Sequence, residues 1–203
     1  MNPDSWLAPR GWIGIVATGD AITASVDRPD LKPVVEAALE GLSPDEATTP
    51  EVVVPRLPSA QATLGPAFLF YPPADFRAAT AGAEEASADQ ISDLLTSAPP
   101  GELDESGISH IESSAFVSGA DDGTVASACG YRRWPNGVAH LSVLTHPGHR
   151  GQGHGRRAAQ AAIGAAIADA LLPQWRARPE ASQRLAVAVG LMRIGAQFSV
   201  QPS

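Results

Sequence analysis

Apolar residues in the N-terminal part of the chain fall into short runs separated by glycine, proline and acidic residues. Residues 11–26 hold two such runs on either side of Thr18-Gly19-Asp20, which predicts a β-hairpin. Residues 31–42 repeat apolar side chains at helical spacing, and Asp30 precedes them at a position suited to cap the first turn. The pattern therefore predicts a hairpin followed by a helix.

Two further apolar runs, at residues 52–54 and 67–71, have the length of strands and are bounded by proline and glycine. No motif with chemical meaning occurs before residue 78, and a stretch rich in Ala, Gly and Glu follows at residues 78–88. We therefore expect residues 1–78 to form a small α+β region of unknown role and residues 79–203 to form a second domain.

The pattern is more regular in the second domain. A helix through Ile91 and Leu95 is expected to end before Pro99-Pro100, and a polar loop is expected over residues 102–106. Asn136-Gly137 predicts a tight hairpin. Strands are expected at 114–118, 125–132, 138–145, 174–177 and 193–201, and helices at 156–172 and 181–189. This order predicts an α/β fold with a mixed, mostly antiparallel sheet flanked by helices.

Composition indicates an ordinary globular protein: of 203 residues, 44% are hydrophobic and 18% are charged. The single cysteine, Cys129, permits neither an internal disulfide nor a cysteine-based metal cluster, so we expect a reducing compartment and no metal. Neither the N-terminus nor the apolar stretch at residues 158–172 has the features of a secretion signal or a membrane span. A cytoplasmic protein without a membrane partner is expected.

The formal charge of −8 is distributed unevenly, because twenty of the 22 acidic residues lie at or before Asp122 and nine of the 14 basic residues lie after it. A basic C-terminal part suggests a polyanionic ligand there, although solvated surface arginines produce the same pattern. The acidic charge of the whole chain disfavours nonspecific binding of nucleic acid, so no nucleic-acid partner is expected.

The strongest candidate site is the segment His149-Arg150-Gly151-Gln152-Gly153-His154-Gly155-Arg156, which joins a predicted strand to a predicted helix. Its glycines allow the backbone to approach a ligand closely. The first N–H groups of the helix have no intrahelical partner and lie at the positive end of the helix dipole, an arrangement that suits a phosphate or diphosphate. Glycines that serve only the packing of the turn are the alternative.

Two familiar phosphate loops are excluded by their spacing. A Walker A loop ends in Gly-Lys-Ser/Thr, whereas this segment ends in Gly155-Arg156-Arg157. A dinucleotide-binding fingerprint that starts at Gly151 needs glycine or alanine at position 156 and an acidic residue about 20 positions later, and both are absent.

The pattern Arg150-x-x-Gly153-x-Gly155, preceded by the predicted strand AHLSVLTHPGHR, resembles the acyl-CoA-binding signature of the GNAT superfamily of N-acetyltransferases. The later segment ASQRLAVAVGL is similar to the fourth helix of that family. The resemblance covers roughly residues 80–203 and implies a GNAT-like transferase domain. The N-terminal segment Leu64-Gly65-Pro66-Ala67 further resembles a subgroup that is common in actinobacteria.

This resemblance implies acetyl-CoA, or another acyl-CoA, as cosubstrate and a small-molecule or peptide amine as acceptor, in a monomer or homodimer. Backbone groups of the predicted strand would hold the pantetheine arm and the acetyl carbonyl, and the glycine-rich loop would hold the diphosphate. Ser182 would lie near the thiol. The implied binding residues are Val143, Leu144, Thr145, Arg150, Gly151, Gln152, Gly153, His154, Gly155, Arg156 and Ser182.

Acyl transfer to an amine requires a neutral nucleophile, and an amine of pKa about 10.4 is neutral in only about one molecule in 2,500 at pH 7. His140 and Glu105 are the candidate bases, and Tyr131 is the candidate acid for the leaving thiolate. The tyrosine and asparagine frequent in this family are replaced here by Ile194 and Pro179. A catalytically weak CoA-binding regulatory or interaction protein is therefore the alternative to an active transferase.

Overall fold

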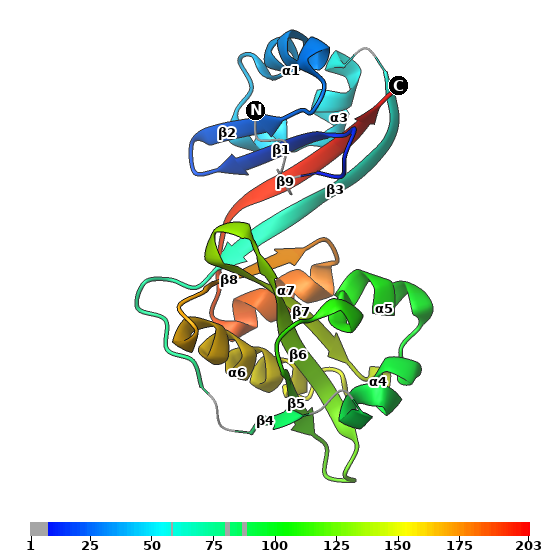
Figure 1. The fold of residues 1–203 in the computed structure, drawn as a ribbon, viewed down its shortest axis with the longest axis vertical. Coiled ribbons are helices and arrows are strands. Elements are labelled where there is room, and N and C mark those ends of the chain that lie inside the picture. The colour runs from blue at the N-terminus through cyan, green and yellow to red at the C-terminus, as the bar shows by residue number, and fades with distance from the viewer. Residues whose placement is uncertain (1–7, 58, 80–81, 87–88) are drawn as a thin grey trace. The chain divides into compact units, whose positions relative to one another are not determined.

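The computed structural model describes residues 8–57, 59–79, 82–86 and 89–203 and divides into two compact units (Figure 1). The first unit consists of Met1–Phe70, Ala177–Glu180 and Arg193–Ser203, and the second of Tyr71–Arg176 and Ala181–Met192. The first unit thus includes the C-terminal strand. The two domains predicted from the sequence, residues 1–78 and 79–203, have other bounds than these units and stay a prediction.

The first unit is a four-stranded sheet with strand order β2-β1-β9-β3. The strands β1 (Ile13–Thr18) and β2 (Ala21–Ser25) form the predicted antiparallel hairpin, and β1 also pairs antiparallel with β9 (Met192–Pro202). The fourth strand is β3 (Ala60–Tyr71).

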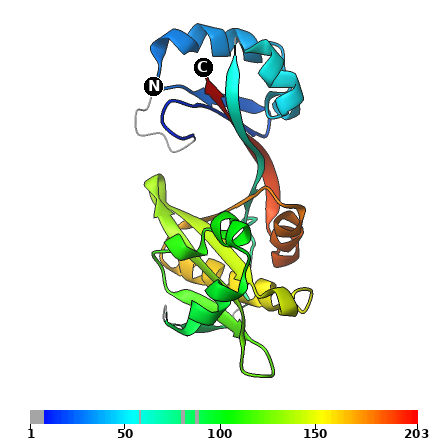
Figure 2. The ribbon, with the colours of Figure 1, turned by 90° about the vertical axis from the view of Figure 1, so that its right-hand side faces the viewer.

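The helices α1 (Lys32–Leu39), α2 (Pro44–Ala47) and α3 (Pro50–Val53) lie together on one face of this sheet, as Figure 2 shows. Their apolar residues pack with Ile15, Phe198 and other buried residues of β1 and β9 to form the core of the unit.

The strand predicted at residues 52–54 is wrong, because these residues belong to α3 and to the 3₁₀ turn that follows it. Pro50 occupies the first turn of α3, where its fixed φ favours a helix and its missing N–H is not needed. Val53 is fully buried in the core of the first unit. A run of valines has the same apolar pattern in either conformation, so the proline decided this element.

The second unit contains an antiparallel meander of four strands, continued by a parallel fifth strand, in the order β8-β7-β6-β5-β4. The hairpin between β6 and β7 turns at Asn136 and Gly137, both in the left-handed region (φ 64° and 74°), as predicted. The five strands are β4 (Glu84–Ala86), β5 (Ala115–Gly119), β6 (Val125–Trp134), β7 (Val138–Thr145) and β8 (Leu172–Ala177).

Helices cover both faces of this second sheet. On one face α6 (His154–Ala168) contacts β5, β6 and β7, and α7 (Glu180–Val189) lies beside α6, where the Val189 carbonyl accepts a hydrogen bond from Gln160. On the other face are α4 (Ser92–Ser97) and α5 (Pro100–Ser106), where Leu94 packs against Leu144 of β7. The predicted mixed, mostly antiparallel sheet flanked by helices is therefore confirmed.

The polar loop predicted at residues 102–106 is wrong, since these residues form most of α5. Pro100 begins the helix and Gly107, with φ 64°, ends it in the left-handed conformation that commonly follows a helix. The predicted polarity was correct, because α5 is a short helix whose acidic residues lie on the surface.

Among the described residues, no helix combines the length and the apolar character that crossing a membrane requires.

Gly195 marks the closest approach of two strands in the first unit. A Cβ atom at this position would lie 1.9 Å from the carbonyl oxygen of Ala17, so Gly195→Ala requires β9 to move away from β1. We expect a loss of at least about 2 kcal/mol of unfolding free energy in urea titrations. Gly101→Ala, where a Cβ atom meets nothing within 4 Å, is the control and should be neutral or slightly stabilising. Equal stability of the two variants would contradict this reading.

Candidate active site

The parallel strands β7 and β8 are paired over only part of their length. Their register begins with Val138 opposite Leu172 and ends with His140 opposite Gln174. Both strands are described throughout, and they continue beyond this point without register partners between them. We call residues 141–145 of β7 together with residues 175–176 of β8 the fork. An unpaired strand edge of this kind offers main-chain hydrogen bonds to an extended ligand.

The other edge of β7 shows which residues face the fork. The Leu144 carbonyl accepts a hydrogen bond from the Ser127 hydroxyl of β6 at 2.8 Å, and His146 donates its N–H to a β6 carbonyl at 2.8 Å. Backbone groups alternate in direction along a strand. Those of Val143 and Thr145 therefore face the fork, whereas those of Leu144 face β6.

The chain leaves β7 through a turn and enters α6 at a glycine. Gly151 and Gly153 have φ values of 77° and 82°, a conformation that favours glycine. Gly153 precedes the first residue of α6, and no side chain caps the helix there. The Arg157 N–H donates to the Gly153 carbonyl at 3.1 Å and closes the first helical turn. The amides before it have no partner within the helix and lie at the positive end of its dipole; they belong to His154, Gly155 and Arg156.

Gly155 holds the start of α6 close to β7 and α7. A Cβ atom at this position would lie 2.9 Å from the Thr145 hydroxyl oxygen and 3.2 Å from a methyl group of Leu185. A side chain here would push the helix away from the strand. The glycine thus places the unpaired amides of α6 beside the open end of the fork.

An ion pair between Arg150 and Glu102 joins the loop to α5. Both side chains are about half exposed, so the pair contributes little to stability, but it shows which helix lies beside the loop. Glu105 follows Glu102 by three residues and therefore lies on the same side of α5. The structure thus carries Glu105 on a helix that is attached to the loop.

The side chain of His154 points into the protein. Its Nδ1 atom lies 3.0 Å from the Ser118 hydroxyl and 2.8 Å from the Arg157 guanidinium, which also donates to Ser118 at 3.0 Å. Burial, followed by the charges of Arg157 and His149, lowers the pKa of His154, and Asp121 opposes this effect. Neutral His154 therefore ties the first turn of α6 to β5. Its backbone amide belongs to the loop, but its side chain does not.

His140 lies at the closed end of the fork. Its ring stacks on Trp134 with 4.1 Å between ring centroids and 15° between planes. Burial, assisted by the charges of Arg176 and Arg132, lowers the pKa of His140 to about 4, although Gln174 partly opposes the shift. The imidazole is therefore neutral near pH 7, which is the state a proton acceptor requires. By strand alternation, His140 shares its face with Leu144, the face covered by α4 and α5.

The model of the Acetyltransferase (GNAT) family matches residues 85–187, which is half of the chain. The chain belongs to the GNAT family. Acyl transfer is the chemistry of this family, and the match includes β5 to β8 and the loop before α6. A search of the curated proteins finds no match.

Two solved structures of GNAT proteins share the fold. A protein from Novosphingobium aromaticivorans has a TM-score of 0.52 at 18% identity, with 71% of this chain and 67% of that chain covered. An acetyltransferase from Colwellia psychrerythraea has a TM-score of 0.53 at 13% identity, with 71% and 58% covered. This GNAT chain thus spans about three fifths to two thirds of their length, and at these identities the likeness concerns the fold alone.

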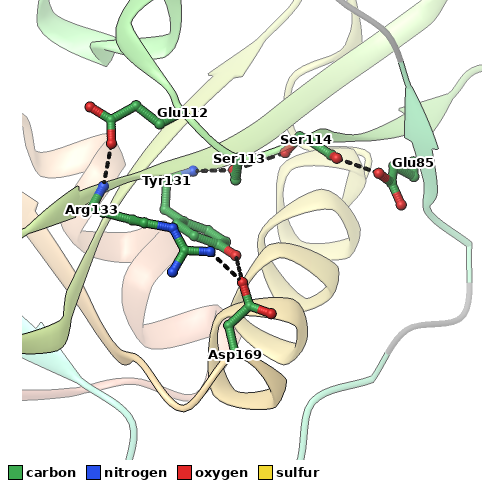
Figure 3. Close-up of polar contacts among 7 residues, drawn as sticks. All are labelled: Glu85, Glu112, Ser113, Ser114, Tyr131, Arg133 and Asp169. Carbon is green, nitrogen blue, oxygen red and sulfur yellow. Dashed lines mark hydrogen bonds and ion pairs between the residues drawn. The ribbon is translucent and has the colours of Figure 1, made fainter.

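Tyr131 faces the opposite side of the sheet from His140. It lies opposite Leu141 in the register, and its hydroxyl donates to Asp169 at 2.9 Å. Arg133 pairs with the same carboxylate at 2.6 Å, as Figure 3 shows. Burial and the hydrogen bond to Asp169 raise the pKa of Tyr131. Because Asp169 follows the last residue of the 15-residue helix α6, this hydroxyl is bound about 22 Å from the glycine-rich loop.

Ser182 is half-buried on α7 and accepts a hydrogen bond from the indole N–H of Trp175 at 3.0 Å. Trp175 is the first residue of β8 beyond the paired stretch. Ser182 is therefore attached to the β8 side of the fork of this GNAT domain.

The structure thus brings most of the residues predicted from sequence to one region, which runs from the fork to the first turn of α6. Tyr131 is the member of the set that is bonded elsewhere. Gln152 and Arg156 are exposed at the loop. Among the described residues, no group of three or more His, Cys, Asp and Glu side chains is arranged to hold a metal ion.

Sequence reasoning missed several side chains that support the site. Ser118 and Arg157 hold the first turn of α6, Glu102 holds Arg150, and Trp134 and Gln174 lie against His140. Apart from the contact of Arg157 with His154 inside α6, these contacts join separate elements, so no local spacing marks them. The one available signal was the register after the Asn136-Gly137 turn, which places Trp134 on the same face as His140.

The pKa of His140 predicts an acid-sensitive fold. Since folding lowers this pKa from about 6.5 to about 4, the unfolded chain binds the proton more readily, and the folded state loses stability as the pH falls from about 6.5 towards 4. The loss is on the order of 2 to 3 kcal/mol. His140→Phe keeps an aromatic ring against Trp134 but does not titrate, so urea titrations at pH 7 and pH 4.5 should show a smaller difference in this variant. An unchanged difference would contradict the assignment.

Proposed function

We propose that this protein transfers an acetyl group from acetyl-CoA to an amine while both substrates are bound. The observation that supports this most directly is the continuity of one chain segment, in which the unpaired edge of β7 runs into a helix start with unpaired amides. An extended pantetheine arm and a diphosphate are joined in the same order in CoA.

The loop residues are proposed to hold the phosphates. The amides at the start of α6 have no intrahelical partner, and Gly151 and Gly153 keep the loop free of side chains. Arg156 adds positive charge at the surface of the loop, which favours a negatively charged phosphate, and Arg150, whose guanidinium pairs with Glu102, is a further proposed contact. The other proposed contacts here are the backbone groups of Gln152, His154 and Gly155.

The fork is proposed to hold the pantetheine arm and the thioester. Val143 and Thr145 present backbone groups to it, and a β7 amide would stabilise negative charge that develops on the acetyl oxygen. Leu144, whose carbonyl is bonded to Ser127, contributes by holding β7 against β6. Ser182, fixed by Trp175, supplies a hydroxyl on the opposite side.

His140 is proposed to accept the proton that the amine loses as it attacks the acetyl carbon. It is neutral near pH 7 and lies where the pairing of β7 and β8 ends. Glu105 on α5 is the second candidate acceptor. A proton must also reach the leaving sulfur, and the hydroxyl of Tyr131 is bonded to Asp169 at the far end of α6. We therefore propose that the proton comes back from His140 or from water.

The position of Tyr131 also favours a second candidate function, a GNAT-like domain that binds CoA with weak or no turnover in a regulatory role. The acceptor in the main proposal is a small-molecule or peptide amine. We further propose that the chain belongs to the actinobacterial subgroup that the segment Leu64-Gly65-Pro66-Ala67 on β3 resembles.

Acetyl-CoA should stabilise the folded protein, by about 2.7 kcal/mol at 100 times its dissociation constant, which corresponds to several degrees in a melting scan. Gly153→Glu should abolish this shift, because a carboxylate would lie where a phosphate is expected. Gly123→Glu is the matched control: its φ of 84° is close to the 82° of Gly153, and a Cβ atom there meets nothing within 4 Å. A normal shift in Gly153→Glu would place the cofactor elsewhere.

Turnover is tested by the release of free thiol from acetyl-CoA in the presence of a panel of amines. The transferase proposal predicts release above the buffer rate with at least one acceptor. Binding of acetyl-CoA without release for any amine would overturn it and leave the regulatory role.

A further inference from the structure

His140 and Gln174 form the last register pair of β7 and β8, so their side chains lie next to each other on one face of the sheet. The Nδ1 atom of His140 and the Oε1 atom of Gln174 are both buried, and neither has a hydrogen-bond partner within normal geometry among the described residues. Two buried polar atoms on directly paired residues are costly unless they satisfy each other. A side-chain interaction with Gln174 raises the pKa of His140, so the two groups lie within reach of each other.

Tyr71 fixes the orientation of the Gln174 amide. The Nε2 atom of Gln174 donates a hydrogen bond to the Tyr71 hydroxyl. The amide is thereby held with its nitrogen towards Tyr71, which leaves Oε1 as the atom available to His140. A carbonyl oxygen accepts hydrogen bonds and cannot donate them. It therefore matches only the tautomer of His140 that carries its proton on Nδ1.

The second ring nitrogen of His140 has a different environment. In contrast to Nδ1, the Nε2 atom is not among the buried side-chain atoms that lack a partner. Stacking on Trp134 holds the ring plane, so the direction of this nitrogen is also fixed.

We propose that Tyr71 and Gln174 are positioning residues that hold His140 in its Nδ1–H tautomer, with the lone pair of Nε2 directed to the acceptor amine. This inference rests on the proposed acetyl transfer. In the step, the N–C bond to the acetyl group forms as the C–S bond breaks, and the proton lost by the amine nitrogen is taken up at Nε2. That proton then passes to the leaving sulfur.

The charged groups around His140 favour rapid return of the proton. The positive charges of Arg132 on β6 and Arg176 on β8 disfavour protonation of the ring. Glu112, which pairs with Arg132 at 3.1 Å, offsets part of the positive potential of Arg132. Gln174 is uncharged and supports the protonated ring only through its carbonyl oxygen. The imidazolium formed in the reaction is therefore short-lived.

The first test measures the tautomer directly in the full-length protein. Two-dimensional ¹H–¹⁵N spectra of the histidine rings at pH 7, with the His140 signals assigned through His140→Phe, should show the proton on Nδ1. Gln174→Met and Tyr71→Phe should each reduce that preference. A dominant Nε2–H form, or an unchanged tautomer in Gln174→Met, would overturn the proposal whether or not the protein is active.

The second test uses Gln174→Glu, which places a carboxylate beside Nδ1 and should raise the pKa of His140 by at least about one unit in a titration followed by the same spectra. With an acceptor amine found in the thiol-release panel, the acid limb of the kcat profile should move to higher pH by a similar amount. Gln61→Glu adds the same charge at an exposed position of β3 and should change neither quantity.

Kinetics separate positioning from binding. Gln174→Met should lower kcat about tenfold or more while KM for acetyl-CoA and the acetyl-CoA melting shift stay unchanged. A kcat equal to that of the unmodified protein would overturn the positioning role. If acetyl-CoA binds but no amine is acetylated, the proposed transfer is wrong, and so is the role of Nε2 as proton acceptor. The spectra still decide whether Gln174 sets the tautomer of His140.

Discussion

The site depends on the point at which two parallel strands stop pairing. β7 and β8 share a register for three residue pairs and then continue without one. Backbone N–H and C=O groups are costly to leave unpaired where water has poor access, so a strand edge that opens inside a domain is stable only if a ligand or solvent occupies it. The open edge of β7 therefore creates the proposed binding site and favours an extended occupant with alternating polar groups.

The start of α6 extends this edge because of close packing. Gly155 allows the helix to approach Thr145 and Leu185, and the buried contacts of His154 with Ser118 and Arg157 tie the same turn to β5. These contacts use side chains that point inward and leave the backbone amides outward. Amides that are already oriented bind an anion without the entropic cost of ordering a flexible loop.

His140 and His154 are neutral near pH 7 for related reasons. Burial is the largest effect on the pKa of each, and arginines add to it. In His154 the neutral ring accepts a hydrogen bond that stabilises the helix start, whereas in His140 it leaves a ring able to accept a proton at the closed end of the fork. The lowered pKa thus has a structural consequence at His154 and, under the proposed function, a chemical consequence at His140.

Local sequence was sufficient for the elements whose conformation depends on neighbouring residues. The Asn136-Gly137 turn, β7 and the glycine-rich entry to α6 were predicted because left-handed turns and strand alternation are encoded within a few positions. Tertiary structure decided the rest. Which helix contacts Arg150 and which side chain lies beside Nδ1 of His140 depend on residues that are far apart in the chain, because only the fold brings these residues next to each other.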